Sequence, residues 1–309
     1  MKVLIAGATG AIGKPLLSYL NDADHELFAF VRSAKRNGEL AAKGAEAIVA
    51  DALDAASVLK AVRHVKPDVI INELTALPKH YTPEEMKAAS PRDKEVRVKG
   101  NANLLTAARA ANCRRYVLQS SAFWYAPGPG LADETVSFAF DASPGIADGC
   151  RTYTDLESAA QESGLQAVIL RYGFFYGPGT WFAPDGDVGE QVRRREVPVI
   201  GEGEGIWNWV HIEDAAAATC AALNADAGVY NVVDNQPVAQ SVWLPAFAKF
   251  LEAPEPPTVS EQHALESAGP DAVYYATKLR GASNQKAKAQ LAFRPRPLQW
   301  LSATVSASA

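Results

Sequence analysis

Residues 3–13 read Val3-Leu4-Ile5-Ala6-Gly7-Ala8-Thr9-Gly10-Ala11-Ile12-Gly13, a short apolar run that passes directly into a loop with three glycines. The run is typical of a buried strand, and the stretch 13–21 that follows is typical of a helix. Glycines at this spacing allow a tight turn, a close approach of the backbone to a pyrophosphate, and close packing of helix on strand. The free N–H groups of the first helical turn attract phosphate. An unliganded tight turn is the alternative to the dinucleotide site that this stretch predicts, with cofactor contacts from Gly7, Thr9, Gly10 and Ile12.

Short runs rich in valine and isoleucine alternate with helix-like stretches over the first 175 residues. This alternation predicts an α/β fold, a Rossmann-type doubly wound parallel sheet with helices on both faces. Ligands of such sheets bind at the carboxyl ends of the strands. The expected strands are 3–6, 26–31, 47–49, 69–72, 115–119 and 167–170, and the expected helices are 13–21, 56–65, 102–111 and 154–162.

The sequence pattern changes after residue 175, where proline and glycine become frequent and the alternation of strand-like and helix-like stretches is lost. We expect residues 1–175 to form a dinucleotide-binding domain and residues 176–309 to form a smaller mixed lobe that binds the substrate. A late apolar run near 228–233 is expected to return to the main sheet. Segment 206–235 is therefore predicted to interleave the lobe with the main domain.

Composition excludes several classes of protein. The 309 residues are 48% hydrophobic and 21% charged, as in ordinary globular chains, and the net charge of −5 comes without a basic stripe. We therefore expect no nucleic-acid partner, and the apolar runs are too short for a membrane span. Cys113, Cys150 and Cys220 are far apart and fit neither a disulfide scaffold nor a metal site, which favours a cytoplasmic location. The sequence does not distinguish between a monomer and a homodimer.

The second expected strand ends in Phe30-Val31-Arg32-Ser33, about 20 residues beyond the glycine loop. An acidic residue at this place holds the ribose hydroxyls of NAD, whereas Arg32 favours the 2′-phosphate of NADP. A solvated basic turn is the alternative. Asp51 follows the third expected strand and is a candidate for the adenine amino group, with Leu53 against the adenine ring; a helix N-cap is the alternative for Asp51.

Together these residues resemble the extended and atypical short-chain dehydrogenase/reductases, the NAD-dependent epimerase/dehydratase-like group. The resemblance is good over roughly residues 1–235 and loose beyond them. It rests on the glycine loop and on five further segments in the order found in that family. These are 67–72 (PDVIIN), 100–105 (GNANLL), 120–125 (SSAFWY), 170–179 (LRYGFFYGPG) and 210–216 (VHIEDAA).

The resemblance implies hydride transfer between a nicotinamide and a carbon that bears oxygen. In such enzymes a tyrosine hydroxyl exchanges the proton, a lysine four residues later lowers the pKa of that tyrosine, and a serine or threonine orients the carbonyl. Ser121 matches the serine position. A strand-end hydroxyl that only satisfies the backbone is the alternative for Ser121.

The Tyr-x-x-x-Lys pair of the family is missing. Counting back from Arg171 places Gly149 at the tyrosine position and Tyr153 at the lysine position. Glu157 then matches an acidic residue common one turn further on. In the other register Tyr153 is the tyrosine, but Glu157 takes the lysine position, where a carboxylate raises the pKa of the tyrosine. Both registers leave the pair incomplete.

Other polar side chains are candidates to replace the pair. We expect Tyr125 or Tyr153 to give the proton, and Arg151 to lower the pKa of a nearby tyrosine or to bind a substrate anion. Arg97 stands where the family often has an asparagine. It brings either positive charge near the site or a surface ion pair. The alternative for both tyrosines is packing as amphipathic wall residues.

Aromatic residues crowd the start of the second lobe, and aromatic walls suit a small apolar or ring-containing substrate. We expect substrate contacts from Phe175, Trp181 and Trp209, with Tyr176 and Pro178 near the nicotinamide. Ordinary core at the junction of the lobes is the alternative.

The sequence thus predicts an NADP(H)-dependent oxidoreductase that acts on a small organic carbonyl, alcohol or activated alkene. The rival hypothesis is a non-catalytic NADP(H)-binding redox sensor, which the missing pair favours. A nucleotide-sugar epimerase or dehydratase is disfavoured, because that chemistry needs the intact pair.

Overall fold

The computed structural model describes residues 1–301 of the chain. Its centre is a seven-stranded sheet in the order β11-β6-β5-β4-β1-β2-β3, with every neighbouring pair parallel. The predicted Rossmann-type doubly wound sheet is confirmed. The strands are β1 (Lys2–Ala6), β2 (Glu26–Val31), β3 (Ala45–Val49), β4 (Val69–Asn72), β5 (Arg115–Ser121), β6 (Gln166–Tyr172) and β11 (Gly228–Val232).

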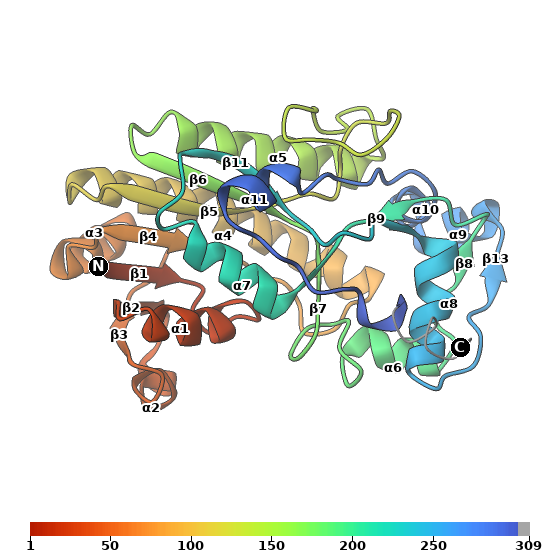
Figure 1. Cartoon of the computed structure of the whole chain (residues 1–309), viewed down its shortest axis with the longest axis horizontal. Helices are drawn as coiled ribbons and strands as arrows, with labels where there is room; N and C mark the ends of the chain where they lie inside the picture. Colours follow the sequence, from red (N-terminus) through yellow and green to blue (C-terminus); the bar gives the residue numbers. More distant parts are fainter. Residues whose placement is uncertain (302–309) are drawn as a thin grey trace.

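Two layers of helices cover the sheet because its strands are apolar on both faces. In β1, Val3 and Ile5 pack into one layer, whereas Leu4 and Ala6 pack into the other. The first layer contains α1 (Gly13–Asp22), α7 (Ile212–Ala221) and α11 (Gln285–Gln290), with the short α2 (Asn37–Ala41) beside it (Figure 1). The second contains α3 (Ala55–Val65), α4 (Pro83–Ala110) and α5 (Pro144–Gln161).

Two helices are much longer than the sequence predicted. Helix α4 begins at Pro83, where the Thr82 hydroxyl accepts a hydrogen bond from the Glu85 N–H, and it runs through Pro91. Helix α5 begins at Pro144 rather than at residue 154. Proline and glycine disfavour helix interiors, so the first half of each helix does not look helical in the sequence.

The smaller lobe lies at one end of the sheet (Figure 1). Its core is built from aromatic side chains such as Phe182, Trp209 and Trp243. No helix within residues 1–301 is both long and apolar enough to cross a bilayer. The lobe contains α6 (Asp187–Arg193), α8 (Gln240–Phe250), α9 (Glu261–Ala268), α10 (Pro270–Thr277) and three strand pairs: β7 (Phe174–Tyr176) with β10 (Trp209–His211), β8 (Val199–Ile200) with β13 (Thr258–Val259), and β9 (Ile206–Trp207) with β12 (Val238–Ala239).

Strand β11 lies at the edge of the main sheet, where it pairs with β6 (Figure 1). The two strands are separated in sequence by residues 173–227, which include much of the smaller lobe. The division of the chain at residue 175 stays a prediction.

Candidate functional site

The glycine loop connects β1 to α1 at the carboxyl edge of the sheet. Gly7 has φ +99°, and a Cβ there would lie 2.5 Å from the Glu73 carbonyl oxygen. A Cβ on Gly13 would lie 2.4 Å from the Gly7 carbonyl oxygen, so both positions require glycine. Gly10 is exposed. A Cβ on Gly10 would lie 3.2 Å from the Gly7 carbonyl oxygen, and no other contact of that Cβ within 4 Å is found among the described residues.

The rim of this loop suits a phosphate group. The N–H groups of Ala11 and Ile12 donate to no backbone acceptor in the described part of the chain, and they belong to the first turn before α1. Thr9 is half-buried and Ile12 is buried beneath the loop. An open backbone surface with free N–H groups at a helix N-terminus is the arrangement that binds a pyrophosphate. The residues present therefore fit a dinucleotide.

Basic side chains lie at the end of β2, next to the loop. Arg32 is exposed, and Arg36 donates from Nη1 to the Thr9 carbonyl oxygen at 3.2 Å. Arg36 also forms an ion pair with Glu39 at 3.0 Å. Positive charge therefore lies within reach of the loop on the side where β2 ends.

Asp51 and Leu53 lie after β3, one strand further along the same edge. Asp51 is exposed, and its Oδ1 accepts a hydrogen bond from the Leu53 N–H at 3.0 Å. The N-cap of α3 is Asp54, whose side chain accepts from the Ala56 N–H. The helix cap that the sequence allowed at this turn is therefore made by Asp54 and not by Asp51, whose contact with adenine stays a prediction.

Glu73 follows β4 directly, and the sequence gave no role to it. Its carboxyl is 4% exposed and accepts a hydrogen bond from the Tyr172 hydroxyl at 3.2 Å. Its other oxygen, Oε2, is buried without a partner in the described structure. Burial raises the pKa of Glu73 to about 8, against the opposing effects of Tyr172 and Arg97. A largely neutral carboxyl therefore lies beside the glycine loop at neutral pH.

Ser121 ends β5 and is 2% exposed. Its Oγ accepts a hydrogen bond from the Phe123 N–H at 3.2 Å, which is the strand-end role that the sequence allowed as an alternative. The neighbouring Ser120 donates to Glu157 Oε1 instead. The hydroxyl proton of Ser121 has no acceptor in the described structure, so the substrate-orienting role stays a prediction.

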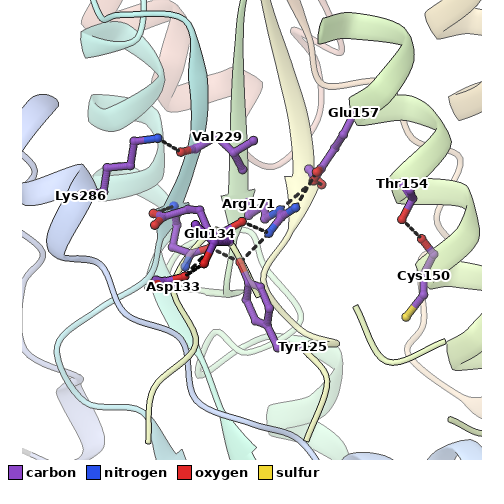
Figure 2. A network of polar contacts seen from close by, with 12 residues as sticks. Tyr125, Asp133, Glu134, Cys150, Thr154, Glu157, Arg171, Val229 and Lys286 are labelled. Atoms are coloured by element: carbon purple, nitrogen blue, oxygen red, sulfur yellow. Dashed lines mark hydrogen bonds and ion pairs between the residues drawn. The ribbon is translucent and has the colours of Figure 1, made fainter. Parts of the chain in front are cut away.

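Tyr125 lies in a buried polar network rather than on an open surface. Its hydroxyl donates to Asn231 Oδ1 and accepts from Arg171 Nη1 at 2.9 Å, while Arg171 also contacts Glu157 (Figure 2). Burial raises the pKa of Tyr125 to about 12, and Arg171 partly offsets this. Because the side chain is 1% exposed with its hydroxyl fully engaged, the geometry favours a structural role. Its predicted proton donation remains without support from this arrangement.

Tyr153 is half-buried on α5, with the Arg97 guanidinium 5.3 Å from its ring centroid. Arg97 is 8% exposed, and its Nε donates to Asp93 at 2.7 Å. Burial raises the pKa of Tyr153, and Arg97 opposes that rise. The cation beside this tyrosine is therefore Arg97, which is the positive charge near the site that the sequence allowed. Arg151 is not beside Tyr153, and its binding of a substrate anion stays a prediction. Arg151 is exposed on α5 and forms no ion pair among residues 1–301.

The predicted substrate residues divide by burial. Phe175 and Trp181 are half-buried, and the Trp181 indole donates to the Lys79 carbonyl oxygen at 3.1 Å. Trp209 and Tyr176 are fully buried in the lobe core, which favours packing over ligand contact. Pro178 is exposed in the loop after β7.

Two partly exposed aromatic residues at this edge were missed by the sequence prediction. Trp124 follows Ser121 in the loop after β5, and its ring centroid lies 5.8 Å from that of Tyr153. Tyr275 comes from α10 in the smaller lobe, and its ring lies 5.9 Å from that of Phe174. Trp124 follows a predicted strand, which is a usable signal, whereas nothing in the sequence connects Tyr275 to this edge.

Comparisons with known proteins agree with this geometry. A family model described as "NAD dependent epimerase/dehydratase family" matches residues 3–233. The chain is 38% identical over 303 residues to a 3-diazoavenalumate denitrifying reductase from a Streptomyces species, covering 97% of this chain and 98% of that protein.

Two further matches are more distant. An NAD(P)H azoreductase from Xenophilus azovorans is 24% identical over 222 residues, covering 72% of this chain and 63% of that protein. The structure of a UDP-glucose 4-epimerase from Thermus thermophilus in complex with NAD superimposes with a TM-score of 0.71 at 23% identity, covering 97% of this chain and 96% of that one. This last likeness shows a shared fold.

Proposed function

Because the chain belongs to the NAD-dependent epimerase/dehydratase family of enzymes, we propose that it is a reductase that uses NADPH to reduce a small conjugated aromatic compound. Its general class is that of the NAD(P)-dependent oxidoreductases. The observation that carries the choice of substrate is Gly149, which stands where the family resemblance expects the proton-exchanging tyrosine.

The absence of that tyrosine favours reduction over oxidation. Oxidation of an alcohol requires a base that removes the hydroxyl proton, and so does epimerisation through a ketone. A strongly electrophilic group takes up hydride without a base and needs at most a hydrogen-bond donor for the charge that develops. In the register that places Gly149 at the tyrosine position, Glu157 is the acidic residue expected one turn further on. The ion pair of Glu157 with Arg171, the residue from which the register is counted, supports this register.

The relatives indicate which electrophile to consider. One is named for the denitrifying reduction of a diazo compound, and another for the reduction of azo compounds. We therefore place a diazo group conjugated to a ring oxygen beside the carbonyls and activated alkenes that the sequence predicts. For an ortho-quinone diazide, one hydride and one proton are taken up, dinitrogen leaves, and a phenol forms with a new C–H bond.

The partly exposed aromatic side chains support a flat substrate. Phe123 and Trp124 are half-buried directly after β5, and the half-buried Tyr153 of α5 has its ring centroid 5.8 Å from that of Trp124. Trp181 is half-buried in the loop after β7. Phe123 stacks on Phe174, with ring centroids 3.9 Å apart. Aromatic rings favour stacking partners of their own kind, so a ring-containing substrate suits this edge.

The cofactor proposal is NADP rather than NAD. When bound, the nicotinamide supplies the hydride. The chain contributes the glycine loop for the pyrophosphate, Asp51 and Leu53 for the adenine, and Arg32 with Arg36 for the 2′-phosphate. Arginine forms strong charge-assisted hydrogen bonds with phosphate, which supports this choice.

The test uses the purified full chain with NADPH or NADH and four acceptors: an ortho-quinone diazide, a conjugated aromatic aldehyde, an enone and UDP-glucose. Loss of NADPH absorbance and release of dinitrogen in equal amounts are expected with the diazide, and no turnover is expected with UDP-glucose. Reactions without protein measure uncatalysed reduction, and the Gly10→Ala variant is expected to need more NADPH to reach the same rate. Cofactor binding without consumption of any acceptor would instead favour the redox sensor.

A further inference from the structure

Helix α5 has a bare face formed by Gly145 and Gly149, which are four residues apart and therefore lie on the same side of the helix. Gly149 lies in the helix interior, where a glycine lowers helix stability by about 1 kcal/mol relative to alanine, so its presence calls for a packing reason. A Cβ on Gly149 would lie 2.5 Å from Cζ3 of the Trp124 ring. A Cβ on Gly145 would collide with the Asp271 carboxyl of α10.

The bare face therefore admits two neighbours that a side chain would exclude. One is the indole ring of Trp124, which takes the space beside position 149. The other is α10, which packs against the N-terminal half of α5 through Asp271. Both neighbours meet at Tyr275 of α10.

Tyr275 is held at both ends. Trp124 Nε1 donates to the Tyr275 hydroxyl oxygen at 3.0 Å, and Trp207 Nε1 donates to the Tyr275 carbonyl oxygen at 3.0 Å. The rings of Trp124 and Tyr275 meet edge to face, with centroids 6.4 Å apart and planes at 75°. The hydroxyl oxygen is thus an acceptor toward Trp124, and its own proton points elsewhere. Within residues 1–301 that proton has no acceptor.

The surroundings keep this hydroxyl protonated. Burial raises the pKa of Tyr275 well above its ordinary value, with Trp124 opposing through its hydrogen bond. The ring is half-buried beside Phe174, at the edge where β6 and β7 meet. A protonated hydroxyl that is fixed on one side and free on the other is a hydrogen-bond donor ready for a ligand.

We propose that Tyr275 donates the hydrogen bond to the substrate oxygen, in place of the tyrosine that position 149 lacks, and that Trp124 is the positioning residue that aims it. This inference rests on the proposed reduction of a conjugated compound. As hydride arrives at the electrophilic group, negative charge builds on the conjugated oxygen, and a fixed donor stabilises that charge.

The experiment compares Tyr275→Phe with the matched control Tyr274→Phe. Tyr274 is the preceding residue on the same helix, and its buried hydroxyl has no partner in the described structure. With an ortho-quinone diazide, Tyr275→Phe is expected to lower kcat by about 100-fold, as loss of one such donor does elsewhere. Tyr274→Phe is expected to keep kcat within about threefold, since it removes no donor that faces the site.

Two further readouts separate a catalytic role from a structural one. With a benzenediazonium salt that carries no ring oxygen, wild type and Tyr275→Phe are expected to turn over equally, because no oxygen is present to accept the bond. A binding measurement gives the second readout. The absorbance shift of para-nitrophenol reports its binding to the protein–NADP⁺ complex, in which no turnover occurs. The Kd is expected to rise about 10-fold in Tyr275→Phe. Trp124→Phe is expected to lower kcat for the diazide but not for the benzenediazonium salt, while the Kd of NADPH stays unchanged.

The outcomes are distinguishable. If wild type reduces the diazide and Tyr275→Phe matches it, the role of Tyr275 is overturned and the proposed function stands. If Tyr275→Phe loses activity equally on both diazo compounds, the residue is structural and the inference is wrong. If wild type reduces none of the acceptors, the proposed function fails, and the inference fails with it.

Discussion

Glu157 of α5 and Arg171 of β6 form a two-point ion pair inside the protein, with Nη2–Oε2 at 2.6 Å and Nε–Oε1 at 2.8 Å. The side chains are 7% and 8% exposed, respectively. Arg171 also donates to the Tyr125 hydroxyl (Figure 2). Ser120 donates to Glu157. The pair therefore fixes α5, with its bare glycine face, relative to the carboxyl ends of β5 and β6.

Replacing Glu157 with glutamine is expected to lower the free energy of unfolding by about 3–5 kcal/mol, because it leaves the buried Arg171 charge uncompensated. Urea denaturation measures the change. Asp148→Asn is the matched control, since the Lys94–Asp148 pair lies at the surface with both side chains 47% exposed. The control is expected to change stability by less than about 1 kcal/mol. Equal effects of the two substitutions would contradict the structural importance of the buried pair.

Tyr125→Phe is expected to leave turnover within about threefold of wild type and to lower stability by about 1–3 kcal/mol, the penalty for unpairing buried polar groups. The hydroxyl is shared between Asn231 and Arg171, and both lose a partner. Steady-state kinetics and urea denaturation on the same sample measure the two effects. A large fall in kcat with unchanged stability would restore the catalytic role that the sequence predicted for this residue.

Arg32→Ala is expected to raise the KM for NADPH by about 10-fold and to leave the KM for NADH unchanged, because the arginine contact is with the 2′-phosphate alone. Arg63→Ala is a suitable control, since Arg63 lies in the last turn of α3 and carries the same charge. Tighter binding of NADH than of NADPH by wild type would overturn the cofactor proposal.

Two glycines of the loop are expected to respond differently to alanine. Gly10→Ala places a methyl group on an exposed surface and is expected to preserve folding but weaken cofactor binding at least about 10-fold, because the methyl group stands where the phosphates approach. Gly13→Ala places a methyl group 2.4 Å from the Gly7 carbonyl oxygen and is expected to lower the melting temperature. Cofactor titration by fluorescence and thermal melts check the difference. Normal NADPH affinity in Gly10→Ala would place the phosphates elsewhere.

The pH dependence of stability is expected to reflect Glu73. Its pKa is about 8 in the folded chain, against an ordinary value of 4.5. Between these values the folded chain binds more protons than the unfolded chain, so the free energy of unfolding falls as pH rises, by at most about 1.4 kcal/mol per pH unit. Glu73→Gln is expected to remove the slope between pH 7 and 8 and to reduce it at lower pH, as measured by urea denaturation across the window.

Asp234 provides a second, separable contribution. Burial raises its pKa to about 7, from an ordinary value of 3.8, so it acts over a lower pH range than Glu73. Asp234→Asn is expected to reduce the slope below about pH 7, where Glu73 also contributes, and to leave the slope between pH 7 and 8 in place. A slope in that upper interval that survives Glu73→Gln would assign it to another group.

The sequence predicts the main sheet well because each strand is a short apolar run with a turn at its carboxyl end. The glycine loop, Arg32 and Asp51 lie within the first 51 residues, and local patterns are enough to place them on one sheet edge. The sequence also shows that the Tyr-x-x-x-Lys pair is incomplete, whether Gly149 or Tyr153 takes the tyrosine position, because both registers follow from counting back from Arg171.

What the sequence does not predict depends on contacts between distant segments. The first half of α5 looks non-helical because of Gly145 and Gly149, and the reason for those glycines is Trp124 and Asp271, which come from other elements. Tyr275 reaches the site by the packing of α10, and that packing leaves no periodic signal. The sequence allows both Arg97 and Arg151 as the cation near a tyrosine, and the packing of α4 on α5 selects Arg97.

The late strand β11 has a consequence for synthesis on the ribosome. Until residues 228–232 emerge, β6 has an open edge with unpaired N–H and C=O groups, and such edges invite pairing with other chains. A chain cut at residue 175, where the texture of the sequence changes, keeps that edge permanently. Such a fragment is expected to aggregate, and the nascent protein depends on its own second half to complete the sheet.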